Sequence, residues 1–134
     1  MNNKLTLAQT IEHVATFHDA FGIPNAAQPT TALNKEEVLL RYKLMREENE
    51  EYLEAAEKED LVEVADALGD MLYILCGTIL RHGLQDKIAE VFEEIQRSNM
   101  SKLGEDGKPI YREDGKVLKG PNYFKPNINE ILQA

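Results

Sequence analysis

The sequence predicts an all-α protein, a four-helix bundle with a C-terminal extension. Two observations lead to this prediction. Apolar residues recur at spacings of three and four in four separate segments, which is the pattern of helices that bury one face. Capping residues or glycines bound most of these segments, and short connections join them. The 134 residues, 43% of them hydrophobic, are enough for one packed core.

The first helix is expected from Thr6 to Phe21. Its apolar side chains include Ile11 and Val14 at helical spacing, and Gly22 then favours a helix end. The following segment, GIPNAAQPTTALN, contains two prolines and several small polar residues. We therefore expect an ordered surface loop here.

The second helix is expected from about Lys35 to Glu57. Asn34 followed by Glu37 resembles a capping box, in which two side chains bond the first free N–H groups of a helix. Tyr42 is one of several apolar or aromatic residues that continue the helical spacing. A long helix of about six turns is the consequence.

Two more helices complete the predicted bundle. Asp60 followed by Glu63 gives a similar cap for a third helix, which contains LVEVADALGDMLYILC and ends near Gly83. A fourth helix is expected from Ile88 to about Asn99. Because only a few residues join the second and third helices, these two must form an antiparallel hairpin.

The C-terminal part changes character. EDGKPI at 105–110 is echoed by EDGKVL at 113–118, and Asp114-Gly115 favours a tight type I′ turn within a small hairpin. GPNYFKPNINEI is interpreted as an extended segment. We therefore treat residues 1–134 as one domain, with a helical core at about 5–99 and an extension at about 100–134.

Charge and composition exclude several classes of function. The net charge of −9 argues against a binder of nucleic-acid polymers, which needs clustered basic residues. Glu63, Asp66 and Asp70 interrupt the longest apolar stretches, so no run approaches the length of a membrane span. Cys76 is the only cysteine, which excludes an intramolecular disulfide and favours a cytoplasmic protein.

The most unusual feature is a run of acidic residues. Eight of the fourteen residues from Glu47 to Asp60 are acidic, and such a run is commonly a solvated helix face. Here Glu47, Glu48 and Glu51 fall on one side of the second helix, where like charges repel each other. A cation or a basic partner would relieve this repulsion.

Asp66 and Asp70 lie four residues apart in the third helix, which is apolar almost all the way round. We therefore expect at least one of them to face the interior of the bundle. An unpaired buried carboxylate is costly, and no basic residue lies between Lys58 and Arg81. A hard divalent cation would provide the missing positive charge.

The hairpin geometry brings the two acidic groups together. With a turn at 57–60 and a rise of about 1.5 Å per residue, Glu51 and Asp66 each lie roughly 9 Å from the turn. Glu48 at roughly 13 Å and Asp70 at roughly 15 Å form a second pair, and Glu63 lies lower at about 4–5 Å. Carboxylate oxygens from two facing helices suit Mg²⁺, with Mn²⁺ or Ca²⁺ as possible substitutes.

These motifs resemble those of the all-α NTP pyrophosphohydrolases, the superfamily that contains the MazG-like, dimeric dUTPase, dCTPase and phosphoribosyl-ATP pyrophosphohydrolase families. The resemblance rests on Glu-Glu-x-x-Glu at 47, 48 and 51 and on the acidic pair before DMLYIL. It covers about half the chain. The string RSNMSKLGEDGKPIYREDGKVLKGPNYFKPN is similar to the C-terminal part of a phage and bacterial MazG-like subgroup.

The resemblance implies Mg²⁺-dependent hydrolysis of a nucleoside triphosphate, with a deoxy- or non-standard nucleotide favoured, to the monophosphate and pyrophosphate. It implies metal ligation by Glu48, Glu51 and Asp70, and a role for Glu47 as a ligand or in orienting the attacking water. It also implies a homodimer or a dimer of dimers. The nucleotide is then the only other partner, with neither a nucleic acid polymer nor a membrane involved.

The sequence departs from the family's second motif, Glu-x-x-Asp. Glu63-x-x-Asp66 matches this motif literally, but the context of Asp70 matches the family better, and Ala67 then replaces the expected glutamate. In that register Asp66, which precedes Ala67, would take the place of the missing glutamate. Both registers remain open, and the hairpin geometry favours Asp66 with Asp70 over Glu63.

Residues near and beyond the end of the fourth helix are candidates for contacts with substrate: Asn99, Lys102, Arg112 and Lys119. Two alternatives to the main functional prediction remain. One is a non-catalytic helical module whose acidic surface binds a basic partner. The other is an activity like that of phosphoribosyl-ATP pyrophosphohydrolase.

Overall fold

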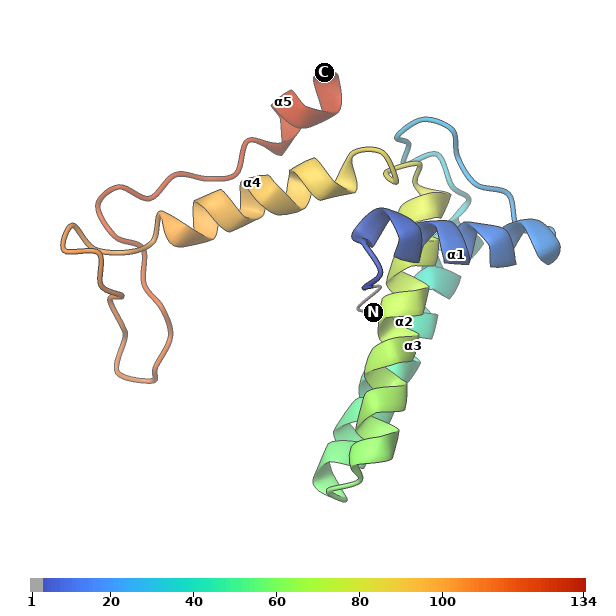
Figure 1. Cartoon of the computed structure of the whole chain (residues 1–134), viewed down its shortest axis with the longest axis horizontal. Helices are drawn as coiled ribbons and strands as arrows, with labels where there is room; N and C mark the ends of the chain where they lie inside the picture. The colour runs from blue at the N-terminus through green and yellow to red at the C-terminus, as the bar shows by residue number, and fades with distance from the viewer. Residues whose placement is uncertain (1–3) are drawn as a thin grey trace. The chain divides into compact units, whose positions relative to one another are not determined.

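The computed structural model describes residues 4–134, and these residues form five helices (Figure 1). They are α1 (Leu7–Ala20), α2 (Lys35–Glu57), α3 (Leu61–Arg81), α4 (Ile88–Met100) and α5 (Ile128–Gln133). The predicted all-α class is confirmed, and the four longer helices begin and end within two residues of their expected bounds. None of the helices in residues 4–134 has both the length and the hydropathy that a bilayer crossing requires.

The chain divides into two compact units, one extending to Asp86 and the other comprising Lys87–Ala134. The division places α4 with the C-terminal segment, whereas the sequence analysis grouped it with the helical core. The single-domain assignment stays a prediction. Each unit is described separately below.

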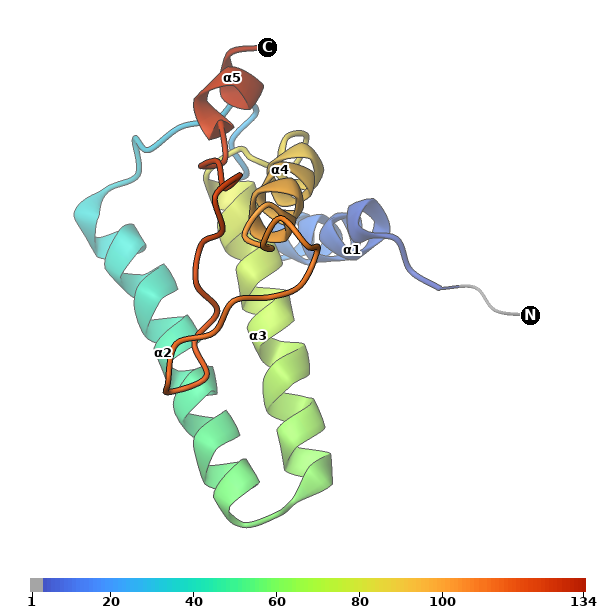
Figure 2. The same cartoon turned by 90° about the vertical axis from the view of Figure 1, so that its left-hand side faces the viewer.

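In the first unit, α2 and α3 lie side by side as the predicted antiparallel hairpin (Figure 2). The turn is closed by two backbone bonds, from Glu59 N–H to the Ala56 carbonyl (3.1 Å) and from Asp60 N–H to the Ala55 carbonyl (3.0 Å). Ala55 on α2 and Ala67 on α3 are both buried. Small side chains at these positions allow the two helix backbones to approach closely.

Helix α1 packs on the distal half of α3, away from the turn of the hairpin. The apolar core of this unit combines Ile11 and Val14 of α1 with Cys76, Ile79 and Leu80 of α3. The loop between α1 and α2 is bonded to the end of α3, because its backbone N–H groups donate to carbonyls at the end of that helix. This arrangement leaves the turn-proximal half of the hairpin without α1.

A buried ion pair fixes the far end of the hairpin. Arg81 binds both carboxylate oxygens of Glu37 and also donates to the Pro24 carbonyl. The Arg81 guanidinium lowers the pKa of Glu37. The predicted capping box at Asn34 is therefore half formed: Asn34 Oδ1 accepts from Glu37 N–H (2.8 Å), but the Glu37 carboxylate binds Arg81 instead of the cap backbone.

The second unit contains α4, a looped segment and α5. Ser98 of α4 is buried, and its hydroxyl donates to the Phe124 carbonyl at 2.8 Å, which ties the C-terminal segment to the helix. The interpretation of residues 120–131 as wholly extended is wrong for the last part, because α5 begins after Asn127. Asn127 Oδ1 accepts from Glu130 N–H (3.3 Å), which is the same capping arrangement as at the start of α2.

The predicted hairpin is present as one antiparallel bridge between Tyr111 and Val117. Its turn is not type I′, which requires two residues with positive φ. Here Gly115 has φ 86° and Asp114 does not have a positive φ, while Gly115 N–H donates to the Arg112 carbonyl (2.9 Å). A type I turn followed by a glycine bulge accounts for this geometry, and Asp-Gly suits it equally well.

Candidate functional site

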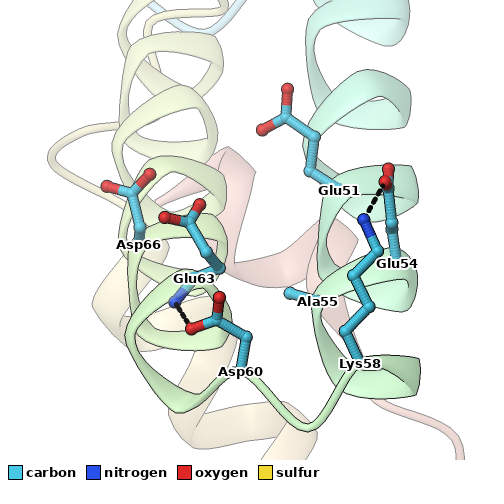
Figure 3. A pocket seen from close by; sticks show the side chains of 7 residues that line it. All are labelled: Glu51, Glu54, Ala55, Lys58, Asp60, Glu63 and Asp66. Atoms are coloured by element: carbon cyan, nitrogen blue, oxygen red, sulfur yellow. Dashed lines mark hydrogen bonds and ion pairs between the residues drawn. The ribbon is translucent and has the colours of Figure 1, made fainter.

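The hairpin of α2 and α3 contains an open acidic cavity of about 290 Å³ near its turn. Its charged lining residues are Glu51, Glu54, Lys58, Asp60, Glu63 and Asp66. Glu51 reaches from α2 toward α3, while the side chains of Glu63 and Asp66 lie side by side on α3 (Figure 3). The cavity therefore brings together the predicted pair from the two helices, Glu51 and Asp66, and also Glu63, the third candidate.

The one basic side chain of this cavity already forms an ion pair with a glutamate of its own helix. Lys58 is the only basic residue in the lining, and its Nζ lies 2.8 Å from Glu54 Oε1 within the same helix. Asp60 accepts from the Glu63 N–H (3.2 Å) as the cap of α3. No basic side chain of the lining thus remains for Glu51, Glu63 or Asp66.

Glu48 lies one helical turn beyond Glu51, on the side away from the hairpin turn, and is the most perturbed carboxylate of the site. Its Oε2 is buried and has no hydrogen-bond partner among the described residues. Desolvation raises the pKa of Glu48 to about 7, with further contributions from the neighbouring carboxylates of Glu51, Asp70 and Asp66. None of these influences comes from a cation.

The structure therefore brings four of the predicted ligands, Glu48, Glu51, Asp66 and Asp70, into one electrostatic cluster. Glu63 joins it through the cavity lining. Glu47 does not: its side chain is exposed and does not line the cavity.

Burial within this cluster differs from the expectation. Asp66 and Asp70 are both exposed, although the sequence analysis expected at least one to face the interior. The reason is the position of α1, which packs beside Gly77 further along α3 and leaves the Asp66–Asp70 segment uncovered. The buried, unpartnered oxygen belongs instead to Glu48 on the facing helix.

The carboxylates do not converge on one point. Within residues 4–134, no three His, Cys, Asp or Glu side chains are close enough together to enclose a metal ion. Carboxylates that lack a cation repel one another, and the long side chains of Glu48 and Glu51 can adopt other rotamers. The helices thus supply the oxygen donors, and different rotamers of the glutamates would be needed to bring them together around one ion.

The predicted substrate-contacting residues all lie in the second unit. Asn99 lies in the last turn of α4 with an exposed side chain, and the Lys102 carbonyl accepts from Gly120 N–H at 2.8 Å. Arg112 forms two bonds to Asp114 (3.0 and 2.5 Å) within the turn. Lys119 Nζ lies 4.8 Å from the centre of the Tyr123 ring. Arg112 and Lys119 therefore have intramolecular partners.

Sequence reasoning also passed over two residues of the hairpin, Arg41 and Gly77. Arg41 is half-buried between α2 and α3, and Gly77 is the position on α3 that makes room for it. The available signal was a glycine inside a predicted helix, which costs about 1 kcal/mol and so indicates a packing or functional reason.

Helical architecture and a carboxylate cluster between two antiparallel helices define a class, the all-α pyrophosphohydrolases that act on nucleotides. Residues 14–99, more than half of the chain, match the family Phosphoribosyl-ATP pyrophosphohydrolase (PRA-PH). The chain belongs to this family, and the superfamily resemblance inferred from the motifs is confirmed.

The fold is similar to a crystal structure described as that of a candidate NTP pyrophosphohydrolase from Exiguobacterium sp. 255-15. The two chains are 26% identical, with a TM-score of 0.53 over 98% of this chain and 96% of that one. No curated protein matches the chain. Family and fold together support nucleotide pyrophosphohydrolase activity in general terms.

Proposed function

We propose that the chain hydrolyses a nucleoside triphosphate between the α- and β-phosphates in a Mg²⁺-dependent reaction, and releases the monophosphate and pyrophosphate. The observation that carries the proposal is the Glu48 cluster. Its buried Oε2 has no partner, and its pKa is raised to about 7 beside three further carboxylates without an opposing base. A divalent cation would remove this unfavourable arrangement.

The donor chemistry fits magnesium, which prefers carboxylate and water oxygens and leaves positions for substrate phosphates. Glu48, Glu51, Asp66 and Asp70 would hold it, with Glu63 as an additional candidate from the cavity lining. Mn²⁺ is the expected substitute. When bound, the ion neutralises charge on the triphosphate and lowers the pKa of a coordinated water.

In the proposed reaction, a carboxylate of the chain accepts the proton of the attacking water. The oxygen of a water attacks the α-phosphorus, the bond from that phosphorus to the bridging oxygen breaks, and pyrophosphate departs with the bonding electrons. One carboxylate of the Glu47, Glu48 and Glu51 set accepts the proton of the water. Glu47 suits this role because it is exposed and lies outside the repulsive cluster.

The substrate class we propose is a deoxy- or non-standard nucleoside triphosphate, on the basis of the resemblance to the MazG-like subgroup. The family's own name makes phosphoribosyl-ATP the alternative substrate. Asn99, Lys102, Arg112 and Lys119 are proposed to contact phosphate or sugar. Arg112 and Lys119 would first release Asp114 and the Tyr123 ring.

A second copy of the chain is the proposed partner, as a homodimer or a dimer of dimers. The hairpin exposes large apolar side chains that a stable soluble protein rarely leaves in water. On α2, Leu40 is 52% and Leu53 57% exposed, and at the start of α3 Leu61 is 79% and Val62 76% exposed. We also propose that the protein is cytoplasmic, because a single buried cysteine without a disulfide suits a reducing compartment.

A non-catalytic acidic interaction module is the second candidate function. The observation that favours it is the exposure of Asp66 and Asp70, because surface carboxylates suit a basic protein partner. Membership of an enzyme family and the unpartnered oxygen of Glu48 favour catalysis instead.

The test is pyrophosphate release from a panel of standard and modified nucleoside triphosphates and phosphoribosyl-ATP, with and without Mg²⁺. Glu51→Gln and Asp70→Asn are the site variants, and Glu57→Gln, an exposed acid of α2 outside the cavity, is the matched control. Release that both site variants abolish and the control retains supports the proposal. No release from any substrate, with no thermal stabilisation by Mg²⁺, favours the interaction module.

A further inference from the structure

Arg41 joins the two helices of the hairpin beyond the carboxylate cluster. Its Nε donates to the Thr78 hydroxyl (2.9 Å) and its Nη2 to the Ile74 carbonyl (2.8 Å). Both partners lie on α3, and one of them is a backbone atom. The guanidinium therefore fixes the side of α2 against the backbone of α3 with two bonds in a defined geometry.

Neither partner carries a negative charge. Arg41 belongs to none of the ion pairs among residues 4–134, and the nearby Glu37 carboxylate is bound at both oxygens by Arg81. Burial lowers the pKa of Arg41, with Glu37 opposing this effect. Joining two helices through a half-buried guanidinium with neutral partners costs desolvation free energy. Apolar packing would join the helices without this cost.

The sequence of α3 accommodates this arrangement. A Cβ at Gly77 would lie 2.6 Å from Arg41 Nη2 and 3.0 Å from His18 Nε2. Only glycine leaves that space free, although glycine inside a helix costs about 1 kcal/mol relative to alanine. The half-buried charge of Arg41 on α2 and the glycine at position 77 on α3 are both unfavourable by themselves, and both are needed for the same contact.

The contact lies on the same seam as the carboxylates. Arg41 and Glu48 are seven residues apart on α2, two turns or about 10.5 Å along one face. Ile74 follows Asp70 by one turn of α3, about 6 Å. The hairpin turn holds the two helices together on one side of the acidic cluster. On the other side Arg41 is the nearer attachment, and the Arg81–Glu37 ion pair lies further along the helices.

Repulsion within the cluster acts against the attachments on either side of it, because like charges on the two helices push α2 and α3 apart. Arg41 is not among the groups that alter the pKa of Glu48. Its influence on the cluster must therefore be geometric, through the separation and register of the helices.

We propose that Arg41 is a positioning residue that clamps α2 onto α3 against Gly77, and so maintains the register in which Glu48 lies opposite Asp70. The inference rests on the proposed function for its consequence, which is metal affinity. The clamp itself is a property of the metal-free protein.

The first experiment measures Mg²⁺ binding by titration calorimetry in Arg41→Met, at a temperature where far-UV circular dichroism shows an intact helical fold. Removing a residue that orients metal ligands typically weakens metal affinity by about 10–100-fold, and we expect a loss in this range with KM rising more than kcat falls. Arg46→Met is the matched control, because Arg46 is an exposed arginine of the same helix whose contacts, Glu50 at 3.6 Å and the Tyr42 ring, both lie on α2. Its affinity should stay within about twofold of the wild type.

Two further variants separate a clamp from a general packing effect. Gly77→Ala keeps Arg41 but fills the space that its guanidinium occupies, and should weaken Mg²⁺ binding in the same direction. Arg41→Lys keeps the charge but loses the planar fork that reaches both Thr78 and Ile74, and should recover only part of the affinity. Wild-type affinity in Arg41→Met, with only a lower melting temperature, would overturn the proposal.

A metal-free measurement decides the clamp even if the wild-type protein does not bind Mg²⁺, an outcome that would refute the proposed function alone. Amide hydrogen exchange in EDTA should accelerate at residues 44–52 and 63–72 in Arg41→Met and stay unchanged in Arg46→Met. Equal protection in both variants would show that Arg41 does not hold these segments together.

Discussion

Replacing Glu48 by glutamine should stabilise the metal-free protein at neutral pH, although it removes a proposed ligand. The pKa of Glu48 is raised from 4.5 to about 7, so the folded protein disfavours the ionised form. At pH below 4.5 the group is protonated in both the folded and unfolded states and has no effect. As pH rises from 4.5 to 7 the unfolded chain ionises first, and stability is lost across this window.

The size of the effect follows from the shift. Each pKa unit corresponds to about 1.4 kcal/mol, but water screens a partly exposed side chain, so we discount the total to about 1–2 kcal/mol. For a protein of 134 residues this amounts to roughly 3–6 °C in melting temperature. Glutamine has the same shape as glutamate and no charge, so Glu48→Gln should melt higher than the wild type by this amount at pH 7.5 and equally at pH 4.

The assay is thermal unfolding by far-UV circular dichroism in EDTA at pH 4, 5.5 and 7.5. Glu57→Gln provides the control, because it removes one exposed negative charge from the same helix outside the cavity. Mg²⁺ should then stabilise the wild type more than Glu48→Gln. A Glu48→Gln protein that melts at or below the wild-type temperature at pH 7.5 would refute the assignment of Glu48 as a strained, unpartnered carboxylate.

Three further perturbations test other parts of the structure. Arg81→Met leaves Glu37 without its buried partner, and urea unfolding should show a loss of about 3 kcal/mol or more. Gly120→Ala places a Cβ 2.3 Å from the Leu103 carbonyl oxygen, so limited proteolysis should cut residues 103–125 faster than in the wild type, with the first unit still protected. Val62→Lys puts a charge on the exposed apolar face of α3, and sedimentation should show dissociation of the proposed dimer, whereas a wild type that sediments as a monomer would contradict that proposal.

Local signals in the sequence predicted the helices well. Asn34 and Asp60 each accept from the N–H three residues later, so the starts of α2 and α3 are set by residues adjacent to them in the chain. The same signal was present at Asn127, yet α5 was missed because six residues flanked by a proline show no helical periodicity. The turn at Gly115 was assigned to the wrong type because Asp-Gly is compatible with two hairpin geometries.

For the candidate site, the sequence predicted the position of each carboxylate along its helix but not which carboxylate is buried. The rise per residue places Glu51 beside Asp66 and Glu48 beside Asp70, since it depends only on distance from the turn. In the structure the other three carboxylates all raise the pKa of Glu48. Which carboxylate is buried depends on how α2 and α3 rotate about their axes and on where α1 lies. Those are contacts between distant parts of the chain, which no local pattern encodes.

The contact made by Arg41 could not be predicted from the residues next to it in the sequence either. In the sequence Arg41 is one of several basic residues of the second helix, and no local pattern predicts its contact with the third helix. The difference from Arg46 arises 36 residues later, at Gly77, whose missing side chain admits one guanidinium into the seam while Arg46 stays exposed. A glycine that weakens its own helix is therefore informative about its partner on the facing helix, and in this hairpin it points to the residue that opposes repulsion among the carboxylates.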